Sequence, residues 1–210
     1  MLSNPKIKPK EVRKILDSKG IRSTIYGHVT VLGIRGYFQD SMGLPGRNDR
    51  GIYDDAFCVA LHDRVVNFNG NTDPSVYRQG IAVLKKGIWN FIAGKHHLSE
   101  PPPRGYAAFR QYGAFTVIRD GQGEDRGEFG INFHRGGENG TSSLGCQTVP
   151  PEQWVAFREL IYGALGTSVN EVMAHPSGVS NKIFTYVLID KAEMDAILNE
   201  PSPLAASAAR

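Results

Sequence analysis

The chain has 210 residues, 40% of them hydrophobic, and is therefore long and apolar enough to bury a core. Its formal net charge is only +3 and its basic residues form no stripe, which argues against a nucleic-acid-binding protein. No apolar run reaches the length of a membrane-spanning helix, so no membrane span is expected. The 24 glycines and 12 prolines are spread widely and favour a turn-rich β architecture over a helical bundle.

The N-terminal segment predicts a short amphipathic helix over residues 9–20. Val12, Ile15 and Leu16 fall on one face at helical spacing, and Gly20 is a C-terminal stop. This segment lacks the apolar central region that is typical of a secretory signal peptide. We therefore expect the protein to be made in the cytoplasm and to reach other compartments only after lysis or through a dedicated secretion machine.

The rest of the chain predicts one β-rich α+β domain over residues 1–200, with a core at about 25–165 and the helical segment 9–20 as an extension. A helix is expected from Pro150 to about 164, with Trp154 and Phe157 on its apolar face. A β-branched strand at 183–190 and a short helix at 192–198 follow, and the tail 201–210 is expected to be disordered. Further strands are predicted at 29–34, 56–61, 65–68, 80–91, 106–111, 115–119 and 129–134, with a hairpin-like turn at 120–127.

Residues 133–148 are the segment most suited to chemistry. They join His134 to Cys146, one of only two cysteines, through a stretch rich in Gly, Ser and Asn. A thiol becomes a good nucleophile near neutral pH when a neighbouring imidazole takes its proton. Gly145 directly precedes Cys146, so the backbone can bend sharply there and turn its N–H groups inward. This composition favours a catalytic pair over a buried cysteine and a histidine that only closes a turn.

The arrangement resembles the catalytic segment of L,D-transpeptidase (YkuD-type) domains, in which a histidine and a variable loop precede Ser/Thr-His-Gly-Cys. His134 falls on the general base of that family, and Ser143, Gly145 and Cys146 fall on its Ser, Gly and nucleophilic Cys. Leu144 stands where the family usually has a second histidine, and the loop is shorter than usual. A short loop ending in Ser-x-Gly-Cys also resembles a divergent branch of cell-wall-attacking effectors with the same fold.

The resemblance implies a single-domain β-sandwich or barrel of L,D-transpeptidase type with a few peripheral helices. It also implies acyl transfer from a peptidoglycan stem-peptide amide through a thioester on Cys146. His134 would pass the thiol proton to the leaving amine, its imidazole held by the backbone carbonyl of Arg135 or Gly136. The backbone N–H groups of residues 144–146 would form the oxyanion hole. No cofactor and no metal are predicted.

Three residues are expected to contact the substrate: Arg135, Ser143 and Arg119. Arg135 directly follows the base and is suited to binding a stem-peptide carboxylate in a bidentate manner. The sequence leaves open whether the acyl-enzyme is released to water, as in a carboxypeptidase or endopeptidase, or to an amine, as in transpeptidation or exchange. The missing signal favours a phage lysis protein or an antibacterial effector. No oligomeric state is predicted.

Two other functions stay open. A non-catalytic cell-wall or glycan binding module would use aromatic side chains such as Trp89, Tyr106 and Tyr112 as sugar platforms. A cysteine peptidase would act on proteins instead of muropeptides.

Other interpretations of single residues are weaker. A Cys58–Cys146 disulfide would consume the nucleophile, and Cys58 lies in an apolar run typical of a buried strand. His96 and His97 fit no zinc spacing with Asp125, Glu128 and His134 and are interpreted as solvent-exposed. A calcium site is disfavoured because no EF-hand spacing occurs among Asp49, Asp54, Asp55, Asn67, Asn69, Asn71 and Asp73.

Overall fold

The structure is a computed structural model that describes residues 3–21 and 29–200. The predicted disorder of 201–210 and the start of the predicted core at 25–28 lie outside the described residues. The elements are α1 (Pro9–Ser18), β1 (Thr30–Arg35), β2 (Asp55–Ala60), β3 (Val65–Gly70), β4 (Ala82–Leu84), β5 (Gly87–His96), β6 (Tyr106–Tyr112), β7 (Phe115–Arg119), β8 (Glu124–Gly127), β9 (Asn132–Arg135), β10 (Gln147–Val149), α2 (Pro151–Leu165), α3 (Val169–Ala174), β11 (Ile183–Asp190) and α4 (Lys191–Asn199).

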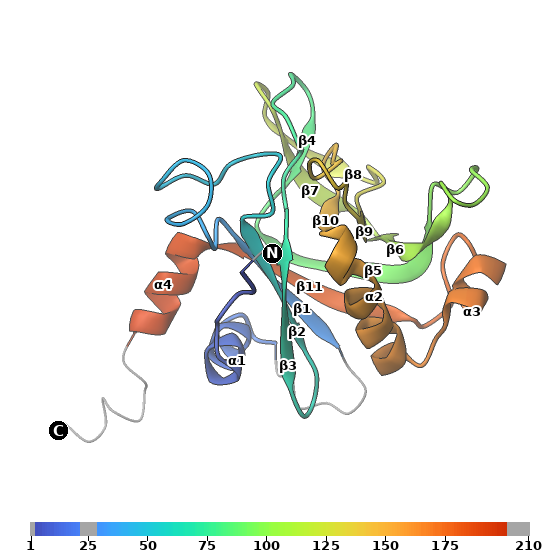
Figure 1. Ribbon diagram of the computed structural model, residues 1–210, viewed down its shortest axis with the longest axis horizontal. Coiled ribbons are helices and arrows are strands. Elements are labelled where there is room, and N and C mark those ends of the chain that lie inside the picture. Colours follow the sequence, from blue (N-terminus) through green and yellow to red (C-terminus); the bar gives the residue numbers. More distant parts are fainter. Residues whose placement is uncertain (1–2, 22–28, 201–210) are drawn as a thin grey trace.

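Eight strands form one strongly curved, barrel-like sheet in the order β10-β9-β6-β5-β11-β1-β2-β3 (Figure 1). β1 runs parallel to β11, and β9 runs parallel to β10. The two outer strands approach each other, because the backbones of Asn71, just after β3, and Thr148 of β10 exchange two hydrogen bonds of 2.9 Å. The sheet is therefore nearly closed. The β-rich fold with a few helices agrees with the sequence-based expectation at this level.

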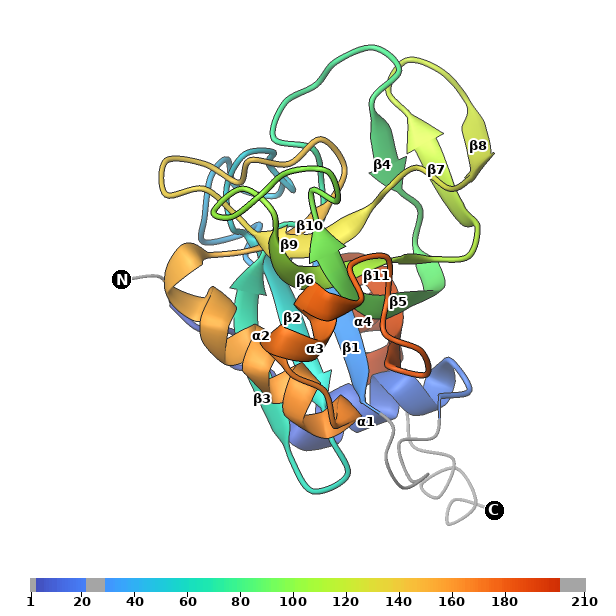
Figure 2. The same ribbon diagram turned by 90° about the vertical axis from the view of Figure 1, so that its right-hand side faces the viewer.

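A second sheet of three strands, β4-β7-β8, projects from the barrel beside the loops that surround β9 and β10 (Figure 2). Its strands pair antiparallel. The turn predicted at 120–127 is shorter than expected, since residues 124–127 form β8. The strand predicted at 129–134 begins later, as β9, and extends to Arg135.

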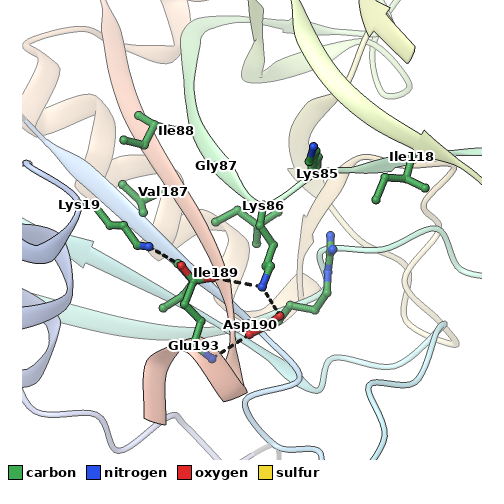
Figure 3. A pocket seen from close by; sticks show the side chains of 12 residues that line it. Lys19, Lys85, Lys86, Gly87, Ile88, Ile118, Val187, Ile189, Asp190 and Glu193 are labelled. Carbon is green, nitrogen blue, oxygen red and sulfur yellow. Dashed lines mark hydrogen bonds and ion pairs between the residues drawn. The ribbon is translucent and has the colours of Figure 1, made fainter. Parts of the chain in front are cut away.

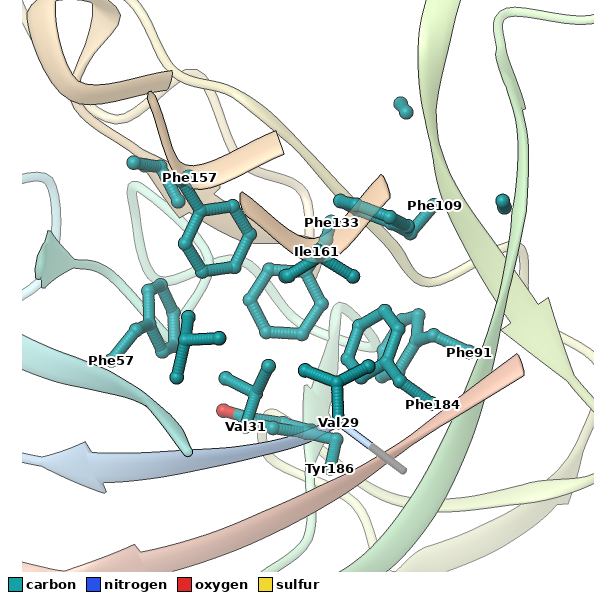
Figure 4. Packing of buried hydrophobic residues seen from close by; sticks show 14 of the residues in the cluster. Val29, Val31, Phe57, Phe91, Phe109, Phe133, Phe157, Ile161, Phe184 and Tyr186 are labelled. Carbon is teal, nitrogen blue, oxygen red and sulfur yellow. The ribbon is translucent and has the colours of Figure 1, made fainter. Parts of the chain in front are cut away.

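Alternation along the strands separates two apolar clusters on the two faces of the sheet. Phe57 and Tyr186 belong to the larger cluster, whereas their neighbours Cys58 and Val187 belong to the smaller one. Figure 4 shows the aromatic rings of the larger cluster gathered under α2. At its centre, Phe133 lies 4.9 Å from the rings of Phe57, Phe91 and Tyr186, measured between centroids.

Helices cover both sides of the barrel (Figure 1). α1 and α4 pack on the smaller cluster, and the predicted face of Val12, Ile15 and Leu16 is buried there. α1 begins where the Glu11 carboxylate accepts a 2.7 Å hydrogen bond from the Lys8 N–H, which caps a free backbone donor. α2 and α3 lie on the other side. No helix within the described residues combines the length and the apolar character that a membrane crossing needs.

Candidate active site

The site lies where β9 and β10 run side by side. Their register pairs Phe133 with Gln147 and His134 with Thr148. Because neighbouring residues on a strand point to opposite faces, Phe133 enters the core while His134 faces the other way. Cys146 directly precedes β10, and its sulfur accepts a 3.4 Å hydrogen bond from the Asn132 N–H. The core thus anchors the strand that presents the imidazole.

His134 and Cys146 border the same cavity, which has a volume of about 360 Å³. The two side chains, twelve positions apart in the sequence, are therefore brought together by the β9–β10 pairing. The remaining lining residues come from the end of β5, the start of β6, the end of β9 and the 136–144 loop: His96, His97, Tyr106, Arg135, Gly136, Gly137, Ser142 and Leu144.

A backbone carbonyl fixes the tautomer of His134. Its Nδ1 lies 2.8 Å from the carbonyl oxygen of Arg135. A carbonyl only accepts, so Nδ1 carries the proton and Nε2 keeps a free lone pair. Burial lowers the pKa of His134 to about 4, against a small opposing effect of the bond to Arg135. The imidazole is therefore neutral and basic at Nε2 at neutral pH.

The Cys146 thiol is half-buried and free. Burial raises its pKa to about 11, and the N–H of Asn132 opposes this rise. The resting pair at neutral pH is therefore a neutral thiol beside a neutral imidazole, not a preformed thiolate and imidazolium.

Gly145 occupies backbone geometry that suits only glycine. Its φ is +125°, and an added Cβ would collide with the carbonyl oxygen of Ala82 on β4. Its N–H donates to the Ser143 hydroxyl at 3.0 Å, and that hydroxyl donates to the Cys146 carbonyl at 2.7 Å. The Gly145 N–H is thus already used, which corrects the expectation that it contributes to the oxyanion hole.

Ser143 is part of the scaffold of this turn. It is 1% exposed and lies outside the cavity lining, so its expected contact with substrate stays a prediction that this placement does not support. Two hydrogen bonds join the Ser143 backbone to Ser75. The Ser75 N–H donates to the Ser143 carbonyl at 2.8 Å, and the Ser143 N–H donates to the Ser75 hydroxyl at 2.7 Å. Ser75 stands in no recognisable motif, so no sequence pattern indicates this contact.

His96 is the second residue that sequence reasoning missed. It is 8% exposed, so its interpretation as a solvent-exposed histidine is wrong, whereas His97 is exposed as expected. The His96 ring lies parallel to that of His134, with 4.1 Å between centroids and 10° between planes. A histidine 38 positions before the base has no local pattern that would reveal this stacking.

The two arginines predicted to bind substrate lie in different places. Arg135 is exposed and borders the cavity. Arg119 lies on β7 outside the lining, where it pairs with Asp125 at 2.8 Å and donates to the Gly80 carbonyl at 2.9 Å. Only Arg135 is therefore placed to meet a ligand beside the thiol.

The weaker interpretations find no support in the described residues. No group of histidine, cysteine or acidic side chains there could hold a metal ion. Asp55 instead accepts hydrogen bonds from the N–H groups of Gly36, at 2.5 Å, and Thr72, at 2.6 Å. Cys58 is buried in β2 and free, so the Cys58–Cys146 disulfide is not formed. Among the aromatic residues proposed as sugar platforms, Tyr106 borders the cavity, whereas Trp89 and Tyr112 do not.

A larger cavity of about 490 Å³ lies away from the thiol, beside β11 and the start of α4 (Figure 3). Its charged side chains are held in ion pairs: Lys86 contacts Asp190 at 2.5 Å and Glu193 at 3.2 Å, and Lys19 also contacts Glu193. Arg35 and Lys85 pair with Asp73 and Glu124, which lie outside the lining. The lining holds no nucleophile paired with a base. Size alone does not make this cavity the better candidate.

The structure thus places the Cys146 thiol and the His134 imidazole, whose tautomer is fixed by the Arg135 carbonyl, on the border of one cavity. No protein-family model, curated protein or solved structure matches the chain.

Proposed function

We propose that this protein is a cysteine acyltransferase or peptidase that acts on peptidoglycan stem peptides and has a catalytic domain of L,D-transpeptidase type. The observation that carries the proposal is the shared cavity of Cys146 and His134, in which the Arg135 carbonyl leaves Nε2 of His134 unprotonated. The resemblance of residues 133–148 to the catalytic segment of that family supplies the substrate class.

In the first step, the Cys146 sulfur attacks an amide carbonyl of the stem peptide as His134 Nε2 takes the thiol proton. A tetrahedral intermediate forms and then collapses: the C–N bond breaks, and the imidazolium gives its proton to the departing amine. The product is a thioester on Cys146. Water or a second amine then attacks the thioester, which restores the thiol and yields hydrolysis or exchange.

Developing negative charge on the carbonyl oxygen needs preorganised donors, and one such donor is typically worth about 3–4 kcal/mol of barrier. The N–H groups of Leu144 and Cys146 are the candidates, since the Gly145 N–H is bonded to Ser143. Ser143 therefore acts through the shape of the turn. By bonding both Gly145 and Cys146, it keeps the backbone on either side of the thiol in one conformation.

The charge around the cavity favours an acidic substrate. Its described lining includes the cation of Arg135 and three histidines, and no aspartate or glutamate. Stem peptides carry free carboxylates, and a guanidinium binds a carboxylate through two parallel hydrogen bonds. Action on the cell wall or in the periplasm, after lysis or dedicated secretion, is part of the same proposal.

The decisive experiment is digestion of purified peptidoglycan and defined muropeptides, with products identified by mass spectrometry. We expect the wild-type chain to cleave or exchange a stem-peptide bond, and Cys146→Ala and His134→Gln to lose this activity. Cys58→Ala is the matched control, because the second cysteine is buried in β2 away from the cavity. Full activity of Cys146→Ala would refute the mechanism.

The same samples test the other functions. Binding of peptidoglycan by both wild type and Cys146→Ala, with no cleavage by either, would indicate a binding module. Cleavage of casein with muropeptides left intact would indicate a peptidase that acts on proteins. Mass spectrometry of the intact chain would detect an acyl-enzyme on Cys146, which neither a module nor a non-covalent enzyme forms.

A further inference from the structure

The base of the proposed reaction is packed against a second imidazole. His96 is the last residue of β5, and its ring lies parallel to that of His134 at a centroid distance of 4.1 Å. The Nδ1–Arg135 bond fixes one edge of the His134 ring, but rotation about that edge would still swing Nε2. The stacked face of His96 opposes this rotation, so the two contacts together define the ring plane.

Asn132 links His96 to the nucleophile. Its side-chain amide donates to His96 Nδ1 at 3.0 Å, and its backbone N–H donates to the Cys146 sulfur at 3.4 Å. Because His96 Nδ1 accepts, the proton of the neutral ring lies on Nε2. Asn132 is 6% exposed and two residues before His134 on β9, so its amide and the imidazole share one face of the strand. Asn132 thus contacts both the Cys146 thiol and His96, the residue that packs against the base His134.

The groups around His96 keep it uncharged. Its ring lies 4.0 Å from that of His97 and 5.5 Å from that of Tyr106. Burial, together with the nearby His134, His97 and Arg110, lowers the pKa of His96 to about 3. A neutral His96 places no cation against His134, so His134 remains free to accept the thiol proton.

We propose that His96, held by Asn132, is a positioning residue that fixes the ring plane of His134 and thereby aims Nε2 at the Cys146 thiol. This inference rests on the function proposed above. His96 needs no contact with the reacting atoms and acts only through His134. The histidine beside the base therefore comes from β5, 38 positions before His134 in the sequence.

The first test needs no substrate. The rate at which iodoacetamide alkylates Cys146, followed by mass spectrometry from pH 5 to 10, reports how far His134 helps the thiol to lose its proton. Cys58 is fully buried in the folded chain and serves as an internal marker of unfolding. We expect His96→Ala to lower the neutral-pH rate by about tenfold, the scale expected for a misplaced general base. His62→Ala, an exposed histidine in the β2–β3 turn, should match wild type.

A double-mutant cycle separates positioning from general destabilisation. On a His134→Ala background, His96→Ala should cause no further loss, because the residue through which it acts is gone. His96→Phe, which keeps a flat ring against His134, should recover the rate to within about threefold of wild type. If His96→Ala does not fold, as judged by circular dichroism, His96→Gln replaces it. Glutamine also removes the flat ring, but it fills more of the buried space than alanine does.

Turnover of muropeptides gives the second readout. His96→Ala should lower kcat by about tenfold while KM stays within about twofold, because ring placement affects the chemical step. The inference is overturned if His96→Ala alkylates and turns over like wild type, or slows alkylation equally with and without His134. Activity that survives Cys146→Ala overturns the proposed function instead, and the alkylation cycle still decides whether His96 positions His134.

Discussion

The α-carbon of Gly145 faces the carbonyl oxygen of Ala82 so closely that a Cβ on residue 145 would collide with it. This contact joins β4, in the small sheet, to the turn that presents the nucleophile. Gly145→Ala must therefore shift the backbone of that turn and must also hold alanine at a φ of +125°. We expect a loss of about 1–3 kcal/mol in the free energy of unfolding, together with loss of muropeptide cleavage.

Urea denaturation and the digestion assay measure both effects. Gly163→Ala is the matched control, because Gly163 lies inside α2 and nothing lies within 4 Å of an added Cβ. That substitution should stabilise the helix by about 0.5–1 kcal/mol and leave cleavage unchanged. Equal behaviour of the two variants would show that the Ala82 contact does not shape the site.

The pH dependence of catalysis should report the buried imidazole. Protonation of His134 removes the base, so kcat/KM should fall as the pH drops through about 4 and not near the ordinary histidine value. Between about pH 5 and neutrality the profile should be nearly flat. A plot of kcat/KM against pH in the folded range checks this, and an acid limb near pH 6.5 would contradict the placement of His134 in a desolvated cavity.

Folding stability should depend on the same group with a definite sign. His134 has a pKa near 4 when folded and about 6.5 when unfolded, so the unfolded chain binds more protons between these values. Its contribution is fully present above pH 6.5 and is lost as the pH falls toward 4. At pH 5 the loss amounts to about 2 kcal/mol.

The opposite shift of Asp54, whose pKa is raised to about 6 mainly by burial, favours the folded state as the pH falls. The diagnostic quantity is therefore a difference between proteins. On going from pH 7 to pH 5, wild type should lose about 2 kcal/mol more than His134→Gln, measured from urea midpoints in both buffers. Parallel losses would mean that residue 134 is not buried as a neutral ring.

Arg135 is expected to contribute to binding of the substrate carboxylate. We expect Arg135→Ala to raise KM for a stem peptide with a free carboxylate by about tenfold, with little change in kcat, because a charge-assisted bidentate pair is lost. An amidated substrate should show no such difference. Arg64→Ala in the β2–β3 turn, where Arg64 pairs with Asp63 on the surface, is the control. An equal KM effect on both substrates would argue against carboxylate recognition.

Ser143 should behave as a scaffold residue. Ser143→Ala removes the hydroxyl that bonds Gly145 and Cys146, so we expect a loss of about 1–3 kcal/mol in stability and a lower kcat with an unchanged KM. Ser142→Ala, at the cavity border, should leave stability nearly unchanged. Steady-state kinetics and thermal unfolding distinguish this role from substrate contact, which would raise KM.

The candidate residues that the sequence predicts lie close together along the chain. His134, Gly145 and Cys146 lie within one short segment, so composition and spacing suffice to single them out. His96 and Ser75 could not be found in this way. His96 reaches His134 only because β6 lies between β5 and β9 in a register that pairs His96 with Tyr106 and Phe109 with Phe133. Such contacts depend on pairing between distant strands.

The same limit applies to the fold. The position of helix α2 follows from its periodic pattern, whereas the single strand predicted at 80–91 is divided in the structure into β4 and the start of β5, which extends to His96. β4 and β10 have only three residues each, too few for a pattern to emerge, yet Ala82 of β4 packs against Gly145 and β10 directly follows Cys146. Closure of the sheet likewise rests on Asn71 and Thr148, which are 77 positions apart and have no signature of their own.

The two hydrogen bonds between Asn71 and Thr148 affect when the site can form during folding. The strand after the thiol is held by β9 on one side and by Asn71 on the other, and both contacts require the chain to have brought remote segments together. A polypeptide still emerging from synthesis, or threaded unfolded through a secretion channel, has no assembled cleft around its sulfur. Any chemistry that needs the cavity bordered by His134 and Cys146 therefore requires the closed barrel.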